Sequence, residues 1–347
     1  MKTRITELLG IKYPIIMAGM TYATDPQMVA AVSNAGGLGI LAVGHMNAEE
    51  TRTAIREVRS LTDKPFGINS VLIFPMGRQN IDVAVEEKVP VINYALGRPW
   101  FIEAVHEYGG RSIVTVSTLR HALRGEQLGA DALIVTGHEA AGHGGAVTAM
   151  VLIPRVVSQA KVPVIAAGSF GDGKGLAAAL VLGAEGVSMG TRFMLTKESP
   201  LSENYKQLLL KSGEEDTIYS TRFDGLPCRV LKTKTAGALA KRKARLIEMV
   251  TSSLKMKRML RLSWREAFSA VSVLNEHGWS PWKTALMTSG IVRMREAILY
   301  GNERFGLLPT GQSLGSMTDL PTCQELIERT VAEAEEVLEQ TREKFRS

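Results

Sequence analysis

The hydrophobic residues of the first 200 positions fall into short runs, and each run is followed by a segment with the apolar spacing of a helix. Short apolar runs bounded by small residues are typical of buried parallel strands. Helical patterns between the runs include Ala48–Thr62, Trp100–Tyr108, Thr118–Leu128 and Gly173–Leu182. We expect strands at Pro14–Met20, Leu38–Gly44, Lys64–Val71, Pro90–Leu96, Arg111–Ser117, Ala132–Gly137, Pro163–Ser169 and Gly186–Phe193.

Eight alternating strand and helix units predict an α/β protein whose sheet closes into a (β/α)8 TIM barrel. Gly129 and Gly183 follow two of the helical segments, where glycine suits the left-handed residue that ends a helix. A doubly wound open sheet is the alternative, and it would carry a GxGxxG turn after its first strand. The residues there, Met17-Ala18-Gly19-Met20-Thr21, do not form that turn, so we favour the barrel.

The alternation stops after Ser199-Pro200. Residues 201–310 are basic, rich in methionine and mostly helical in pattern, and they contain Trp264, Trp279 and Trp282. We expect them to form a smaller, mostly helical second domain that covers the barrel mouth as a substrate or lid domain. A final helix is predicted from Cys323 to about Lys344, with apolar residues near helical spacing that should pack back on the barrel. The barrel domain would then comprise residues 1–200 plus about 311–347.

The composition is that of an ordinary globular protein, with 45% hydrophobic and 22% charged residues among 347. Cys228 and Cys323 lie far apart and form no CxxC motif, which favours a reducing compartment. The N-terminal residues lack the apolar core of a signal peptide, and no run of about 18 apolar residues could span a membrane. We therefore expect a cytoplasmic protein without membrane association.

The positive charge is concentrated in one segment. Residues 229–265 contain twelve lysines and arginines against one acid, Glu248, a local charge of +11 that leaves −5 for the rest of a chain of net charge +6. This segment indicates either an anionic ligand or partner, or a solvated helical face. We expect no nucleic-acid partner, because no recognisable binding module or interleaved aromatic residues accompany the charges. Assembly into a homo-oligomer stays open at this point.

A histidine lies in a loop of small residues directly after the sixth expected strand. The loop contains Gly142, Gly144 and Gly145, which leave room for a flat ligand or a backbone to approach His143. Parallel α/β folds place their chemistry at this end of their strands. His143 could take a proton from a carbon acid or donate to a developing oxyanion, and the simpler alternative is a loop histidine that bonds a carbonyl.

The other candidate side chains rank lower. We expect His138 to be structural and Glu139 to orient a neighbour or pair with a base. His45 is a lesser candidate for the barrel mouth, and His121 falls in a helical segment and is not expected to be catalytic. No group of His, Cys and carboxylate residues has metal-ligand spacing, so no metal is predicted. A covalent cysteine mechanism is disfavoured because Cys228 and Cys323 fall outside the barrel strands.

Glycine pairs end the last two expected strands. Gly168-Ser169 and Gly190-Thr191 occupy the place where TIM barrels often hold a phosphate with backbone N–H groups, although glycine at tight turns would look the same. A cofactor with a terminal phosphate, such as FMN, fits this arrangement. Its ring would lie near Ala18, Gly19 and Met20, and Asn69 at the end of the third strand could bond the ring edge or a ribityl hydroxyl, or merely cap a turn.

These motifs resemble the nitronate monooxygenase family, which comprises FMN-dependent (β/α)8 barrels with a helical second domain and is related to flavin-dependent enoyl thioester reductases. The resemblance spans the chain and is carried by Pro14–Met20, Asn34–Gly39, Lys64–Asn69, Ala140–Gly145, Pro163–Phe170, Ala184–Phe193 and Gly311–Ser313. It implies that residues 1–200 plus about 311–347 form an FMN-binding barrel and that His143 is the catalytic base or hydrogen-bond partner. It also implies that FMN is held by Ala18, Gly19, Met20, Asn69, Gly142, Gly168, Ser169, Gly190 and Thr191, with Gln312 and Ser313 reaching the cofactor from the C-terminal segment.

Two positions depart from the family pattern. Ala141 replaces the first glycine of the usual Glu-Ala-Gly-Gly-His loop. Thr115 stands where some relatives carry a basic residue in the fifth strand near the flavin, which removes a positive charge from beside the ring.

The resemblance implies a nitronate monooxygenase that oxidises alkyl nitronates with O2 to carbonyl compounds and nitrite. The alternative is an NAD(P)H-dependent flavin reductase that acts on an enoyl or other CoA or ACP thioester, or on a quinone, with the basic segment binding the phosphates. Either function takes a small-molecule substrate, and NAD(P)H is needed only for the second. A binding or assembly protein on a decayed barrel is disfavoured by the intact His143 and the intact glycine pairs.

Overall fold

The computed structural model describes residues 1–241, 246–259 and 280–345. Eight parallel strands pair in the order β1-β8-β7-β6-β5-β4-β3-β2, and a bridge between Ile16 and Leu38 joins the two edges into a barrel. The strands are β1 (Ile15–Met17), β2 (Gly39–Ala42), β3 (Phe66–Val71), β4 (Val91–Ala95), β5 (Arg111–Val116), β6 (Ala132–Thr136), β7 (Val164–Ala167) and β8 (Val187–Met189). The predicted (β/α)8 TIM barrel is confirmed, and each strand is shorter than its apolar run.

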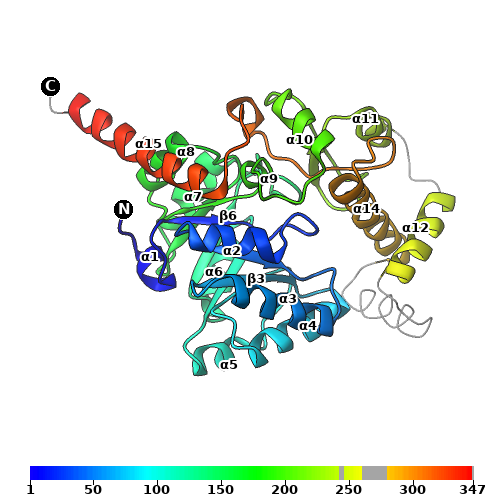
Figure 1. Cartoon of the computed structure of the whole chain (residues 1–347), viewed down its shortest axis with the longest axis horizontal. Helices are drawn as coiled ribbons and strands as arrows, with labels where there is room; N and C mark the ends of the chain where they lie inside the picture. The colour runs from blue at the N-terminus through cyan, green and yellow to red at the C-terminus, as the bar shows by residue number, and fades with distance from the viewer. Residues whose placement is uncertain (242–245, 260–279, 346–347) are drawn as a thin grey trace.

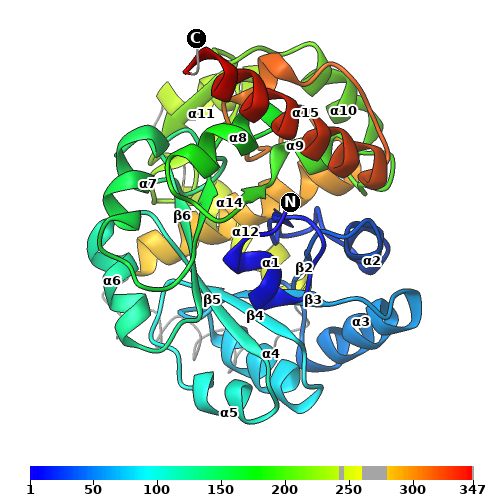
Figure 2. The same cartoon turned by 90° about the vertical axis from the view of Figure 1, so that its left-hand side faces the viewer.

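Helices alternate with the strands and cover the outside of the barrel (Figures 1 and 2). Side-chain oxygens of Asn47, Thr118 and Asp172 accept the N–H three residues on, which fixes where three helices begin. Gly129 and Gly183 have φ of +96° and +89°, as predicted for residues that end helices. The helices are α2 (Pro26–Asn34), α3 (Ala48–Leu61), α4 (Pro75–Glu86), α5 (Ile102–Glu107), α6 (Leu119–Gln127), α7 (Ala149–Val157), α8 (Gly173–Val181) and the short α9 (Thr191–Met194).

The barrel interior is filled by branched side chains and closed at its amino end by helix α1 (Arg4–Leu9). Ile5 and Leu9 of α1 belong to one buried cluster with strand residues such as Ile16, Ile40 and Ile165. A second, larger cluster fills the layer between the strands and the outer helices. With the amino end sealed by α1, the opening of the barrel lies at the carboxyl ends of the strands.

Helix α15 (Cys323–Lys344) packs against α8 and α2 and so takes the outer position that the short α9 leaves uncovered. A Cβ at Gly173 would lie only 2.5 Å from the Cβ of Glu333, so the glycine permits this close packing. The Gly173 N–H also donates to the Glu333 carboxylate at 2.8 Å. The predicted helix and its return to the barrel are confirmed.

Residues 201–310 supply most of the elements near the carboxyl ends of the strands. These elements are α10 (Glu203–Leu210), β9 (Thr217–Ser220), β10 (Cys228–Leu231), α11 (Lys234–Lys241), α12 (Leu246–Met259) and α14 (Pro281–Tyr300), and the 3-10 turn η1 (Ser313–Ser316) follows. The antiparallel β9–β10 hairpin was not predicted, because two four-residue strands give little periodic signal. Trp264 and Trp279 lie outside the described residues. The division into two domains at residues 200 and 311 stays a prediction.

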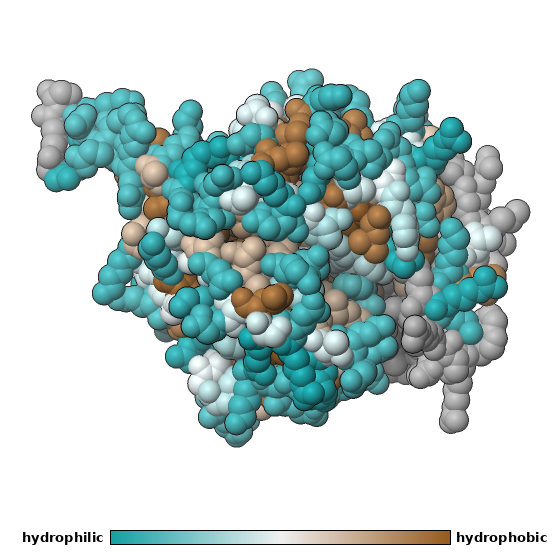
Figure 3. All heavy atoms as spheres, in the orientation of Figure 1, coloured by the Kyte–Doolittle hydropathy of each residue, from teal (hydrophilic) through white to brown (hydrophobic). Residues whose placement is uncertain are grey.

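Polar side chains dominate the face drawn in Figure 3, and the apolar groups on it are small and separate. Within the described residues, none of the helices is both long and apolar enough to cross a membrane.

Candidate active site

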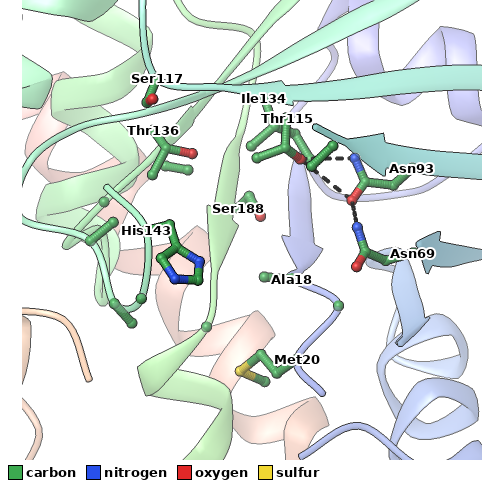
Figure 4. A pocket seen from close by; sticks show the side chains of 18 of the residues that line it. Ala18, Met20, Asn69, Asn93, Thr115, Ser117, Ile134, Thr136, His143 and Ser188 are labelled. Atoms are coloured by element: carbon green, nitrogen blue, oxygen red, sulfur yellow. Dashed lines mark hydrogen bonds between the residues drawn. The ribbon is translucent and has the colours of Figure 1, made fainter. Parts of the chain in front are cut away.

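A cavity of about 600 Å³ opens at the carboxyl ends of the strands (Figure 4). Met294 and Ile298 of α14 contribute apolar side chains to its wall. Gln312 is the one predicted site residue that does not line it; its N–H donates instead to the Ser169 hydroxyl and the Glu139 carbonyl, at 3.1 and 3.0 Å. The predicted residues that do line it are Ala18, Gly19, Met20, Asn69, Gly142, His143, Gly168, Ser169, Gly190, Thr191 and Ser313.

The turns after β7 and β8 hold the 311–313 segment through side-chain hydroxyls. Ser169 adopts a left-handed φ of +63°, which is uncommon outside glycine, and its hydroxyl donates to the Glu139 carbonyl at 3.0 Å. The Thr191 hydroxyl accepts the Gly311 N–H at 3.0 Å. The Ser169 hydroxyl both donates to and accepts from the protein, so the backbone N–H groups of these turns and the O–H of Thr191 are the donors left for an anionic ligand.

The glycines of the cavity wall leave room for a flat ligand. A Cβ at Gly142 would meet no atom within 4 Å, and one at Gly190 would first meet the Met20 sulfur at 3.4 Å. Thr191 is the first residue of α9, where the N–H has no partner inside the helix. These features fit a cofactor with a planar ring and a phosphate tail.

A chain of amide hydrogen bonds fixes Asn69 at the edge of the cavity (Figure 4). The Asn69 Nδ2 donates to the Asn93 Oδ1 at 2.6 Å, and the Asn93 Nδ2 donates to the Ile113 carbonyl and the Thr115 hydroxyl, at 3.0 and 2.9 Å. With its nitrogen engaged, Asn69 presents its side-chain oxygen as an acceptor. Thr115, the residue of β5 that departs from the family pattern, accepts from Asn93 and so supports this chain.

His143 projects into the cavity from the loop between β6 and α7 (Figure 4), and its side chain is 39% exposed. Its Nε2 lies 2.7 Å from Oδ2 of Asp224, a residue of the turn between β9 and β10 whose side chain is only 7% exposed. Burial alone would lower the pKa of His143, but the hydrogen bond and the charge of Asp224 outweigh it and raise the pKa above 6.5. A histidine held in this way is suited to give or take a proton.

The β9–β10 hairpin holds the backbone of the His143 loop. Gly142 and Arg229 exchange two backbone hydrogen bonds of 3.0 and 2.9 Å, and the Tyr219 hydroxyl donates to the Gly144 carbonyl at 3.0 Å. The Arg229 guanidinium donates to the His138 carbonyl at 3.2 Å and is itself buried. Arg229, counted above in the basic segment, is therefore a structural residue of this contact.

His138 contacts the Gly145 carbonyl through Nδ1 at 2.8 Å, and the Glu139 carboxylate accepts the Ala149 N–H where α7 begins. His45 packs on the ring of Tyr22 and lines a separate, smaller cavity, so it does not join His143. His121 reaches the wall of the main cavity from α6. Sequence spacing gave no sign of Asp224, because 81 positions separate it from His143.

Cys228 adds a third potential ligand beside this pair, and the donor atoms of Cys228, His143 and Asp224 lie within 4.8 Å of one another. Two ligands of one tetrahedral zinc ion would lie about 3.4 Å apart, given zinc–ligand bonds of about 2.0–2.2 Å. The observed 2.7 Å is the length of a direct hydrogen bond, and burial raises the pKa of the Cys228 thiol well above its ordinary value. The geometry is that of a hydrogen-bonded pair, and the expected lack of a metal stays a prediction.

The sequence model of the family described as nitronate monooxygenase matches residues 2–76 and 73–333. A Rhodococcus jostii protein named (3aS,4S,5R,7aS)-5-hydroxy-7a-methyl-1-oxo-octahydro-1H-indene-4-carboxyl-CoA dehydrogenase is 37% identical over 338 residues, 96% of each chain. A probable nitronate monooxygenase of Staphylococcus saprophyticus is 34% identical over 67% of this chain and 79% of its own. The structure of FabK from Thermotoga maritima superposes with a TM-score of 0.81 at 36% identity, over 99% of both chains.

Proposed function

Because the chain belongs to the nitronate monooxygenase family, whose matched members are oxidoreductases, we propose that it is an FMN-dependent oxidoreductase acting on an acyl thioester of CoA or ACP, with NAD(P)H or NAD(P)+ as the second substrate. The observation that carries this proposal is the His143–Asp224 pair at the wall of an apolar cavity. Reduction or oxidation at carbon moves a proton together with two electrons, and this pair can give or take that proton. An alkyl nitronate already lacks its acidic proton and has no such need.

FMN would be held by residues that the structure gathers around the cavity. The backbone N–H groups of Ser169 and Thr191 would face its phosphate, and the Asn69 oxygen would accept from the ring edge. Gly19 lets its backbone pass close to the Asn69 side chain, since a Cβ at this position would lie 2.5 Å from the Asn69 Cβ. Bound FMN supplies two-electron transfer between a pyridine nucleotide and the substrate.

The residues of the chain orient the substrate and handle the proton. Met294 and Ile298 of α14 exclude water from the wall and suit the apolar part of an acyl group. His143 donates a proton to one carbon of the acyl C=C bond as the other carbon accepts a hydride, and it takes that proton back in the reverse direction. The full-length similarity to the Rhodococcus CoA dehydrogenase supports a thioester, because it covers the 201–310 segment that supplies α14 and Asp224.

Nitronate oxidation is the second candidate, favoured by the 34% identity to the staphylococcal protein. In that reaction dioxygen would accept electrons, a carbonyl compound and nitrite would be released, and no pyridine nucleotide would be used. His143 would then serve as a hydrogen-bond donor to the nitro oxygens.

The two candidate functions can be distinguished by mixing the purified, FMN-loaded protein with a pyridine nucleotide without oxygen, and with a nitronate in air. We expect NADH or NADPH to bleach the visible flavin absorbance without oxygen, and crotonyl-CoA or another 2-enoyl-CoA, whose C=C bond can accept the electrons, to restore it. His143→Gln should slow restoration roughly 100-fold or more while bleaching continues. Rapid oxygen uptake with propyl-2-nitronate, without bleaching by either nucleotide, would instead establish the second candidate.

A further inference from the structure

His143 and Asp224 come from different parts of the fold, the barrel loop after β6 and the turn of the β9–β10 hairpin. We propose that Asp224 is the positioning residue of the active site: it holds Nε2 of His143, so that Nδ1 is the atom that exchanges a proton with the substrate. The identity of the proton acceptor rests on the proposed function, whereas the pairing itself does not.

The carboxylate determines which nitrogen of the imidazole carries the proton. Asp224 can only accept, so the Nε2 proton stays in the 2.7 Å hydrogen bond. In the neutral ring Nδ1 then holds the lone pair and acts as a base, and in the charged ring Nδ1 carries a proton and acts as an acid. Figure 4 shows a ring nitrogen of His143 on the side of Ser188 and Ala18, across the cavity.

Asp224 is itself held in one place by three features. Its Oδ1 accepts the Leu226 N–H at 3.1 Å, which leaves Oδ2 for His143. Gly225, the next residue, has φ of +88°, a conformation that suits glycine. Gly290 of α14 lies against the other side, where an added Cβ would be 2.6 Å from the Asp224 Cβ. No replacement of Gly290 can leave the carboxylate where it is without displacing backbone.

Helix α14 connects this support to the substrate cavity. Gly290, Met294 and Ile298 recur every four residues and so share one face of the helix. Gly290 packs on Asp224, while Met294 and Ile298 line the cavity. The helix that contacts the proposed acyl group therefore also sets the position of the carboxylate that holds His143.

His121 and Arg124 of α6 line the same cavity as His143, and the nearer charged groups on the elements around the pair are engaged elsewhere. The Glu139 carboxylate accepts the Ala149 N–H, Arg192 pairs with Asp319, and Arg293 donates to the Phe305 carbonyl. Arg295 lines the separate small cavity beside Tyr22. On the hairpin and the loop, Tyr219, Arg229 and His138 make the backbone contacts described above, and the Cys228 thiol, protonated, lies beside the Asp224 carboxylate.

Four variants of the flavin-loaded protein test the proposal. Asp224→Asn removes the charge at constant size, Asp224→Glu keeps the charge on a longer side chain, and Gly290→Ala displaces Asp224 while every catalytic group stays. Gly237→Ala in α11 is the matched control, because a Cβ there would meet no atom within 4 Å. The readouts are the His143 pKa from 15N-edited NMR of the imidazole, and the pH profiles of kcat and KM for the reduction of crotonyl-CoA.

We expect Asp224→Asn to lower the His143 pKa by about 1–3 units, the effect of losing an opposite charge in contact. The alkaline limb of kcat should move down with it, so that kcat at pH 8 falls about tenfold or more while KM stays within twofold. Asp224→Glu should recover part of both effects, Gly290→Ala should reproduce them in weaker form, and Gly237→Ala should match the wild type.

An unchanged His143 pKa in Asp224→Asn overturns the proposal, as does a pH profile of kcat that does not move. If Asp224→Asn fails to fold, Gly290→Ala and Asp224→Glu decide in its place, and wild-type values in both overturn the proposal. A shifted His143 pKa in a protein that turns over no thioester supports the positioning role and rejects the proposed substrate, so the two failures are distinguishable.

Discussion

The side-chain nitrogen of Asn69 lies 2.6 Å from the side-chain oxygen of Asn93, and this bond decides which end of Asn69 faces the active-site cavity. Asn93 is almost fully buried, and its own nitrogen is held by β5. We expect Asn69, which lies in β3, to contact the flavin. Its orientation is therefore set by Asn93 of β4 and, through Asn93, by β5.

Asn93→Ala should therefore weaken flavin binding. Without its partner, Asn69 is free to rotate, and we expect the flavin dissociation constant to rise about tenfold, equivalent to about 1.4 kcal/mol. Titration of flavin-free protein with FMN measures this change. Thr115→Ser is the control, because it retains the hydroxyl that accepts from Asn93. Equal affinities in Asn93→Ala and wild type would show that Asn69 keeps its orientation unaided.

The His143–Asp224 pair should make folding stability depend on pH in one direction. The folded pKa of His143 is raised above 6.5, so the folded protein binds this proton more tightly than the unfolded chain does. The resulting stability is fully present below pH 6.5 and is lost as the pH rises through the folded pKa. The difference in unfolding free energy between wild type and His143→Gln, from urea denaturation, should be largest near pH 6 and shrink toward pH 9. A difference that grows with pH contradicts this assignment.

Neutralising part of the basic segment should weaken the binding of a CoA substrate. The change is Lys241→Gln with Arg242→Gln and Lys243→Gln; Lys241 is exposed, and the other two lie outside the described residues. If the segment attracts the CoA phosphates, KM should rise and its dependence on salt should become shallower, since screened charge pairs contribute less. The same three substitutions should not change the rate of nitronate oxidation. If KM is unchanged at both low and high salt, the basic segment is a solvated helical face that does not bind the substrate.

Asp319→Ala should destabilise the fold more than Arg329→Ala. Arg192 is 3% exposed and donates to Asp319 at 2.8 Å, so the first change leaves a buried guanidinium without its carboxylate. We expect a loss of about 2–3 kcal/mol in unfolding free energy. Arg329 is half exposed and forms a second ion pair with the Asp319 carboxylate. Its replacement should lower the unfolding free energy by about 1 kcal/mol or less. Chemical denaturation of both variants measures the two values.

The barrel was predictable because its signal is local. Each buried strand is a short apolar run, and the helix Cys323–Lys344 begins at the residue where its apolar spacing begins. His143 and the glycine pairs at Gly168 and Gly190 were selected as site candidates in the same way, since each lies at the end of such a run or in the loop after it.

The partners of these residues were not predictable, because their contacts are distant in sequence. Asp224 meets His143 only after the β9–β10 hairpin docks on the barrel, and nothing around Phe223-Asp224-Gly225 marks it as more than a turn. Asn93 left a faint sign, a polar residue in the apolar strand Val91–Ala95. A buried polar group needs a partner, and that rule could have directed attention to its neighbours.

The position of α15 has a consequence for how the protein is made. Its buried face covers α8 and α2, which are translated long before residues 323–344 emerge from the ribosome. Until then, the nascent chain exposes apolar side chains on both helices, and the barrel wall stays incomplete. Synthesis of this protein therefore includes an interval in which that apolar strip is open to aggregation.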